Sequence, residues 1–584
     1  MALLSTALRL LLTSGSLLGA LRSSAQGTPA WQWVQAGASA EASGGRSVAV
    51  AASGNVFVTG YFTRSLTLGP TTLTTDSTDA FVAKYAANGQ VLWAQKLGSS
   101  RQGVGYQVVA DAADNCYVAG VFRGTALVGA TTLTSQSDAD EFLVKYSAQG
   151  TPQWAQRASD LAPTYYDFSR RRHYFPLYPF HNLHLALDTQ GNLYSASEFV
   201  GTITRGTTTF TALGLDALVV KYSPQGQVQW ARQGGGTGSD YAADVAVDAA
   251  GNVYVVGGYN AAATFGSVVL PSNSSSLSNN YNTYVLKYDA QGQVQWGRAT
   301  VPASFQDYAL LTAVGVDATG NVYVLGDFAP TLTLGAMTLS LPAASSAHVF
   351  LAKYDPLGTV LWTRMAGSLP PQTVLVSNGY DLAVQADGTA TITGIYSQSM
   401  TFEQLTLGTP GGANQTYVAR YTPQGTVSWA GRAGTQLAGL AGNVNRGYGV
   451  SSDGQGVSYV TGDFGGQADF GPFTLTNSTP TEANVFVGKI GAVALASRAA
   501  ASAAPLRVYP TLATGASVSV SFADPTPGPT DLRLVNAVGQ VVRQQTLPPA
   551  SSQYTLVTQG LPAGLYRVQA SSAAGWQTSP VVIP

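Results

Sequence analysis

The chain has 584 residues and a formal net charge of −1, and only 10% of its residues are Asp, Glu, Lys or Arg. Glycine accounts for 65 residues, whereas cysteine occurs once, at Cys116. A charge so close to zero argues against nucleic acid or an anionic membrane surface as a partner. A single thiol excludes an intrachain disulfide framework.

Residues 1–25 have the features of a secretory signal peptide. Arg9 precedes a short apolar stretch over residues 10–21, and the small residues Ser23 and Ala25 suit cleavage before Gln26. The apolar stretch is too short and too rich in Ser and Gly to form a stable membrane span. We therefore predict an exported protein whose mature chain begins at Gln26 and has no transmembrane span.

From residue 26 onward, two sequence patterns alternate. The first is Gly-Asn followed by β-branched and aromatic residues, as at Gly251 to Tyr254, and the second ends in a basic residue and tyrosine, as at Lys287 and Tyr288. A long and regular period of this kind indicates stacked supersecondary units. The basic residue of the second pattern recurs at intervals of 61, 76, 66, 66, 67 and 69 residues, at Lys84, Lys145, Lys221, Lys287, Lys353, Arg420 and Lys489.

Each repeat is predicted to contain four strands. The Val- and Tyr-rich runs are typical of strands, and the short Asp-Ala-Ala-Gly-Asn connection favours a tight hairpin because Gly and Asn tolerate positive φ. A second hairpin leads into Gly-x-x-x-Trp. Seven such repeats predict an all-β fold, a seven-bladed β-propeller over residues 26–490. The tryptophans of the Gly-x-x-x-Trp element are Trp93, Trp154, Trp230, Trp296, Trp362 and Trp429.

The seventh repeat has no Gly-x-x-x-Trp element after Lys489. Gly27 to Trp31 has the spacing of Gly150 to Trp154, so we expect an N-terminal strand to complete the last blade, with Trp33 as an alternative register. Such a strand closes the ring and leaves no unpaired edge. The repeats resemble the SBBP-type propeller repeats of bacteria, and this resemblance implies a scaffold without a particular activity.

The polar residues that recur in every repeat are predicted to be structural. Each hairpin offers one aspartate, whereas a calcium loop needs an alternating set of oxygen ligands, so we expect these aspartates to shape turns. The recurrent Lys or Arg is expected to form an ion pair within its blade or to pack on an aromatic ring. Cys116 takes the place of a strand valine and is expected to be buried. The recurrent aspartates are Asp111, Asp188, Asp248, Asp317 and Asp453.

One long connection, between Trp154 and Leu185, departs from the repeat and produces the 76-residue interval. Its aromatic and arginine side chains suit stacking on sugars and capture of carboxylate or sulfate groups. Alternatively, the segment is a plug whose rings pack over the mouth of the central channel. The candidate ligand-binding residues are Tyr165, Tyr166, Asp167, Arg170, Arg171, Arg172, His173, Tyr174 and Tyr178.

No metal or cofactor is predicted. His173, His181 and His184 could supply zinc ligands, but their spacing matches no metal signature. No Ser-His-Asp order, paired catalytic carboxylates or phosphate-binding loop stands out.

We therefore predict a non-catalytic binding or adhesion module for extracellular glycan or a surface protein. The alternatives are a polysaccharide-active enzyme built from loops, a structural surface component, or a quinone-dependent enzyme, since Asp289 to Trp296 resembles the tryptophan-docking repeat of quinoprotein dehydrogenases.

Residues 491–505 form an Ala/Ser-rich linker, and residues 506–584 are predicted to form a small β-sandwich. Its motif residues are Val508, Tyr509, Pro510, Gly539, Leu561, Pro562, Gly564 and Tyr566. In order and spacing, these motifs resemble the type A C-terminal sorting domain of the type IX secretion system of Gram-negative bacteria. The resemblance implies export through the periplasm by the type IX secretion machinery, removal of the module, and a released or surface-anchored propeller. Alternatively, the module is an accessory domain that stays attached.

Overall fold

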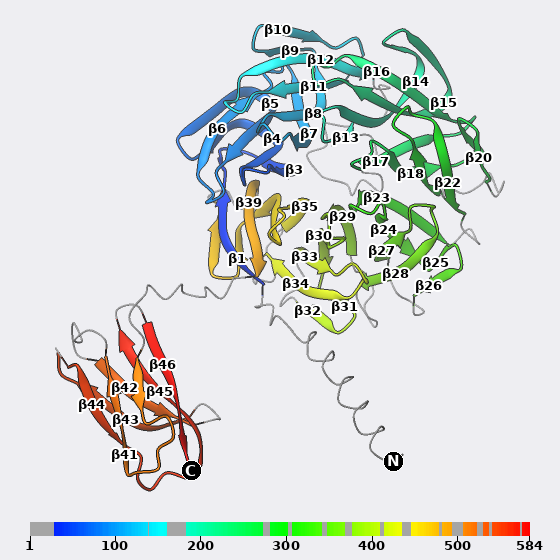
Figure 1. Cartoon of the computed structure of the whole chain (residues 1–584). Coiled ribbons are helices and arrows are strands. Elements are labelled where there is room, and N and C mark those ends of the chain that lie inside the picture. Colours follow the sequence, from blue (N-terminus) through cyan, green and yellow to red (C-terminus); the bar gives the residue numbers. More distant parts are fainter. Residues whose placement is uncertain are drawn as a thin grey trace, which may run out of the picture. The chain divides into compact units, whose positions relative to one another are not determined.

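All regular secondary structure in the described part of the chain is β-strand (Figure 1). These residues fall into two compact units, and the boundary lies directly after Ala492. No helix long and apolar enough to cross a membrane occurs among them. The computed structural model describes residues 29–137, 139–160, 183–272, 281–301, 307–341, 347–367, 377–408, 414–434, 445–477, 482–492, 506–522, 530–536, 540–549, 551–572 and 575–584.

The N-terminal unit consists of four-stranded antiparallel sets that follow one another along the chain. The predicted signal peptide lies outside the described residues. In chain order, the sets are β3 (Ser43–Val50), β4 (Val56–Leu68), β5 (Thr71–Tyr85) and β6 (Val91–Lys96); β7 (Gln102–Ala110), β8 (Cys116–Arg123), β11 (Asp140–Tyr146) and β12 (Pro152–Asp160); β13 (His184–Leu187), β14 (Leu193–Arg205), β15 (Thr208–Tyr222) and β16 (Val228–Gly235); β17 (Asp240–Val247), β18 (Val253–Tyr259), β21 (Asn282–Tyr288) and β22 (Val294–Thr300); β23 (Tyr308–Val316), β24 (Val322–Ala329), β27 (His348–Tyr354) and β28 (Val360–Gly367); β29 (Ser377–Val384), β30 (Ala390–Ser397), β33 (Asn414–Tyr421) and β34 (Val427–Ala433); and β35 (Asn445–Ser452), β36 (Val457–Gly465), β39 (Ala483–Ala492) and β1 (Pro29–Ala36).

The long connections of the sets carry small hairpins, as from Ala263 to Leu270. In the first and third sets, the hairpin instead continues the two middle strands, β4 with β5 and β14 with β15. The short strand β2 (Ala38–Ser39) pairs with the extended end of β4. The separate hairpins are β9 (Thr125–Val128) with β10 (Thr131–Thr134), β19 (Ala263–Phe265) with β20 (Val268–Leu270), β25 (Thr331–Leu334) with β26 (Met337–Ser340), β31 (Ser399–Phe402) with β32 (Leu405–Gly408), and β37 (Gln467–Phe470) with β38 (Phe473–Thr476).

Apolar side chains on both faces of each set pack against the neighbouring sets. In the third set, Tyr194 and Ala196 share a core cluster with Val255 of the fourth set. Leu193, on the opposite face of β14, packs in another cluster with Tyr117 of the second set. Burial on both faces explains why the strands are almost continuously apolar. In Figure 1 the sets follow one another around a common centre, with β1 beside β39.

β1 completes the last set, but in the alternative register. Trp33 lies opposite Lys489, as Trp93 lies opposite Lys84 in the first set. The preferred register, with Trp31 in the repeat position, is therefore wrong. A bulge between Trp31 and Trp33 offsets the two strands, so Trp31 takes the place that valine holds in other sets, and its ring packs edge-on against Phe470 at 5.0 Å.

We predict that Trp33→Ala weakens the closure between the last and first sets. The Trp33 indole N–H donates to the backbone oxygen of Ala87 in the first set at 3.0 Å. Because this side chain is partly buried, its loss should lower the free energy of unfolding by about 2–3 kcal/mol, as measured by urea denaturation. Exposed Gln32 is the control, and equal effects of Trp33→Ala and Gln32→Ala would contradict the role in closure.

The C-terminal unit contains two sheets that share one hydrophobic core. Val508 and Val520 of one sheet pack in the same cluster as Leu534 and Val568 of the other. Of the predicted linker, residues 491–492 belong to the end of β39, and residues 493–505 lie outside the described residues. The sheets are β40 (Arg507–Tyr509), β41 (Ser517–Ser521) and β44 (Gln553–Val557), and β43 (Val541–Leu547), β42 (Thr530–Val535), β45 (Gly564–Ser572) and β46 (Gly575–Ile583).

Candidate functional site

The predicted ligand-binding residues, from Tyr165 to Tyr178, lie outside the described residues, as does His181. The chain on either side of them is described. The outer strand β12 ends at Asp160, and the innermost strand of the third set begins at His184. The connection therefore leads from the outer edge of the second set to the inner edge of the third.

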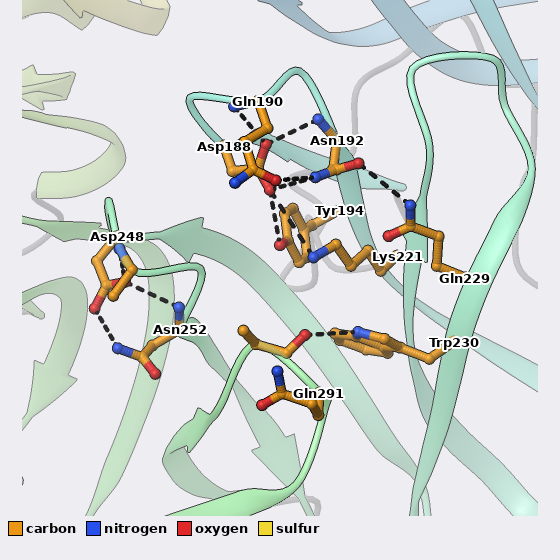
Figure 2. A network of polar contacts seen from close by, with 12 residues as sticks. Asp188, Gln190, Asn192, Tyr194, Lys221, Gln229, Trp230, Asp248, Asn252 and Gln291 are labelled. Atoms are coloured by element: carbon orange, nitrogen blue, oxygen red, sulfur yellow. Dashed lines mark hydrogen bonds and ion pairs between the residues drawn. The ribbon is translucent and has the colours of Figure 1, made fainter.

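The aspartates that recur in the repeats shape their turns, as predicted. The carboxylate of Asp188 accepts the backbone N–H of Asn192 at 2.9 Å, its side-chain amide at 2.8 Å, and the hydroxyl of Tyr194 at 3.1 Å (Figure 2). Lys221 lies 3.9 Å from the same carboxylate and 5.0 Å from the centre of the Tyr194 ring. Both predicted roles of the recurrent lysine, an ion pair within its set and packing on a ring, are therefore confirmed for Lys221. Lys84 packs on the Phe57 ring but pairs with Asp114 of the next set at 3.1 Å.

Neighbouring sets are joined by the outer tryptophans. The Trp230 indole donates to the backbone oxygen of Ala290 in the next set at 3.1 Å (Figure 2), and Trp296 donates to that of Pro356 at 3.1 Å. Cys116 is completely buried among apolar side chains, as predicted. These repeated features are scaffold, so residues for recognition must be sought where the sets differ.

The innermost strands differ at a bulge. In β3, β7, β17, β23, β29 and β35 the register shifts by one residue, which inserts one extra residue into the strand. A bulge re-aims the side chain of the extra residue. The residues at this position vary from set to set, and they are Arg46, Tyr106, Ala243, Thr312, Tyr380 and Tyr448.

Three of these bulge residues belong to a chain of ring and guanidinium contacts that crosses the junction between the first and last sets. The Arg46 guanidinium lies 4.3 Å from the ring centre of Tyr448 and 5.3 Å from that of Tyr61. The rings of Tyr448 and Tyr380 stack with centres 5.3 Å apart. Arg446 lies 5.6 Å from the Tyr448 ring centre. We call these five residues the arginine–tyrosine stack.

Both arginines of the stack are partly exposed and charged. Burial opposes the charge of Arg446, but the Asp463 carboxylate, 3.0 Å from its Nε, raises the pKa of the guanidinium above its usual value. Tyr380 and Tyr448 are also partly exposed. The stack therefore offers cationic forks and aromatic faces, a combination that suits planar anionic groups and sugar rings.

A second group of polar residues follows the bulges directly. Asp244 lies 3.5 Å from Nδ1 of His184 and accepts the backbone N–H of Val314 at 2.8 Å. Asp381 accepts the backbone N–H of Val450 at 2.7 Å, and burial raises its pKa to about 7. These carboxylates tie one innermost strand to another. No group of three His, Cys, Asp or Glu residues in the described ranges is placed to hold a metal ion.

The sequence analysis did not identify the arginine–tyrosine stack, although the sequence contains a signal for it. Arg46, Tyr380 and Tyr448 each follow a glycine in the first strand of their repeat, as does Tyr106. The residues around this position in the first strand are mostly small or apolar. An arginine or tyrosine directly after the glycine therefore differs from the core pattern of the strand. The contact of Arg46 with Tyr448 joins residues from the first and last repeats, and no local pattern predicts it.

Two buried carboxyl groups meet between the third and fourth sets. A Cβ atom on Gly235 would lie 2.7 Å from Oδ1 of Asp216 and 3.0 Å from Oδ2 of Asp240, so both carboxyl groups flank this glycine. Oδ1 of each has no hydrogen-bond partner. At the equivalent junction of the sixth and last sets, the neutral side chains of Gln415 and Asn445 flank Gly434.

We predict that Asp240→Asn stabilises the protein above pH 7. Burial, with a smaller contribution from Asp216, raises the folded-state pKa of Asp240 to about 7, whereas the unfolded value is about 4. Between these values the folded chain holds a proton that the unfolded chain has lost, so stability falls as pH rises through this window. The Asp240→Asn variant has no carboxyl group to ionise at this position, so it lacks this loss of stability. Its amide can also donate a hydrogen bond to Asp216, in the way that Asn445 could donate to Gln415.

Urea midpoints measured at pH 5, 6, 7 and 8 test this expectation. The Asp240→Asn midpoint should exceed that of the wild type at pH 8 and depend less on pH. Asp76→Asn, on an exposed side chain of β5, controls for the loss of a carboxylate and should change stability by less than about 0.5 kcal/mol. A lower midpoint for Asp240→Asn at pH 8 would show that the two carboxyl groups do not oppose each other.

The motif residues of the C-terminal unit divide between its core and its surface. Val508 and Tyr566 are buried, and the Tyr566 hydroxyl donates to the backbone oxygen of Pro562 at 2.8 Å. Tyr509 is exposed, and Pro510 follows it through a cis peptide bond. Leu561 packs beside the core, and Gly564 begins β45. Gly539 lies outside the described residues.

Comparison with known families agrees with both units. A family model described as a beta-propeller repeat matches residues 229–257, and one described as a secretion system C-terminal sorting domain matches residues 507–584. The protein is secreted to the outer surface or the extracellular space of a Gram-negative bacterium. The repeat match and the strand pairings confirm the predicted all-β fold of propeller type.

Individual relatives are distant. A WD repeat-containing protein of Acanthamoeba polyphaga mimivirus is 25% identical over 332 residues, which are 53% of this chain and 19% of the relative's length. A gluconolactonase from Xanthomonas campestris has 11% identity and a TM-score of 0.26, with 63% of this chain and 94% of that chain covered. A protein of unknown function from Bacteroides caccae has 9% identity and a TM-score of 0.24, with 50% and 89% covered. Likeness at this level carries no information on activity.

Proposed function

We propose that the protein is a secreted, non-catalytic binding module for extracellular glycan. One observation carries the proposal. Around the innermost strands, cationic and aromatic side chains are partly exposed at the arginine–tyrosine stack, whereas the carboxylates nearby are engaged. Asp381 and Asp244 accept backbone N–H groups of other strands, and Asp463 holds Arg446. A carboxylate fixed in this way suits a structural tie better than a general base.

The scaffold of this module is proposed to be a seven-bladed propeller over residues 26–490. Its support is the run of four-stranded sets, of which the last is completed by β1. The C-terminal unit, residues 506–584, is proposed to be a β-sandwich because its two sheets share one core. Residues 1–25 and 491–505 are proposed as signal peptide and linker. Removal of the sandwich on export would leave the propeller released or anchored at the surface.

The binding face is proposed to be the end of the ring that carries the long connections. Each inner strand enters from that end, and the bulge residue lies near the middle of its strand, as Arg46 does in β3 and Tyr448 does in β35. The described chain resumes at Leu183 after the insertion, and the next residue, His184, lies 3.5 Å from Asp244 of the fourth set. Its tyrosines and arginines have the same chemistry as the stack. Guanidinium forks match the carboxylate or sulfate groups of acidic sugars.

We predict that replacing residues 163–181 with a Gly-Ser segment weakens glycan binding at least tenfold. The test is a binding screen of the purified protein and this variant against acidic and neutral polysaccharides, with binding to the acidic set expected for the wild type. Gln149→Ser, on an exposed side chain of the short turn between β11 and β12 at the opposite end of the ring, is the control and should bind normally.

Two results would contradict the proposal. Equal binding by the wild type and the 163–181 variant would show that the insertion is not part of the binding site. Absence of binding by either protein would show that glycan is not the ligand class. Assembly of the purified protein into ordered arrays without any ligand would instead favour the structural surface component. Hydrolysis of a panel polysaccharide would favour the enzyme.

A further inference from the structure

The C-terminal unit carries a row of exposed apolar side chains on one face of a sheet. Leu565 of β45 lies opposite Val582 of β46, and Leu512 forms a parallel bridge with Val582 on its other side. Their exposed fractions are 50% for Leu512, 51% for Leu565 and 41% for Val582. Residues paired across strands point to the same face, so the three side chains form one continuous row, here called the apolar row.

The apolar row departs from the alternation of buried apolar and exposed polar residues that is expected along its strands. Val581 and Ile583 point into the core, and Val582 between them would be expected to be polar in a sheet with one solvated face. Two residues further along β45, Arg567 is exposed on the same face as Leu565. The result is an apolar strip with a cationic residue at its border, and a contiguous exposed strip of this kind marks an interaction site.

The backbone beside the row is already paired. The Val582 N–H donates to the oxygen of Thr511 at 2.7 Å, and the Val582 oxygen accepts the N–H of Ala513 at 2.7 Å. An incoming strand could not pair with this edge at Val582. Side chains, and not backbone groups, are therefore what the row offers to a partner.

The row is also built from the segments that match the sorting family. Leu565 adjoins Tyr566, whose ring is buried and whose hydroxyl is bonded to Pro562, and Leu512 follows Pro510 by two residues. The buried motif residue Tyr566 thus fixes the position of Leu565 on the opposite, exposed face of β45. A sorting domain must be recognised by a protein of the export apparatus, and the match covers residues 507–584.

We propose that the apolar row is the surface by which the secretion machinery recognises this protein. The partner is a protein of that machinery with an apolar surface and a carboxylate placed to meet Arg567. The proposal does not depend on what the propeller binds, because it concerns only the C-terminal unit and export.

The test is export of the full chain in a bacterium that has this secretion system, measured as the fraction of protein outside the cell relative to the periplasm. Leu565→Ser and Val582→Ser should each reduce the exported fraction at least fivefold and leave folded protein in the periplasm. Val557→Ser is the matched control, because Val557 is an exposed strand valine, 54% exposed, on the other sheet of the same unit. It should be exported like the wild type.

A conservative variant separates recognition from folding. Leu565→Met keeps the row apolar and should be exported normally, and protease resistance of the periplasmic Leu565→Ser protein should equal that of the wild type. Normal export of both serine variants in the row would overturn the proposal, as would an equal loss in Val557→Ser or in Leu565→Met. A purified full chain that dimerises through Val582, with export unaffected by Val582→Ser, would instead assign the row to a second copy.

Discussion

The structure depends on the contact between the outer strand of one set and the short turn of the next. An indole N–H and a lysine ammonium converge on the same turn oxygen, as Trp362 and Lys353 do at Pro423, at 3.1 and 3.3 Å. The turn glycine leaves room for the indole, since a Cβ on Gly425 would lie 2.9 Å from the Trp362 ring. Each set thus stabilises its neighbour, and the chain needs few surface charges and no disulfide.

This contact explains why one end of the ring is uniform and the other is free to vary. The short turns must all accept the same tryptophan and lysine, so their sequences are constrained. The long connections and the bulge positions of the inner strands make no such contact with a tryptophan, and side chains as different as Arg46 and Ala243 occur at the bulges. Recognition on a rigid frame is usually built from such variable positions.

The sequence predicted the repeat well, because the period of Lys and Trp and the Gly-Asn turns are local patterns with a direct structural cause. It failed for the register of β1, because β1 and its partner β39 come from opposite ends of the unit. No short turn fixes their offset, as the turn between β5 and β6 does in the first set. It also missed the contacts of Arg46 with Tyr448, which the closing of the ring brings together from opposite ends of the chain. The insertion residues Tyr165 to Tyr178 remain a prediction based on composition.

The most direct test of the proposed binding face is hydrogen–deuterium exchange of the secreted protein with and without an acidic polysaccharide. The account predicts slower exchange in peptides that contain Arg46 and Tyr448 and in those from residues 161–182, with no change at the short turn from Ala87 to Gly89. Protection confined to the short turns, or to neither end of the ring, would contradict a binding face at the long connections.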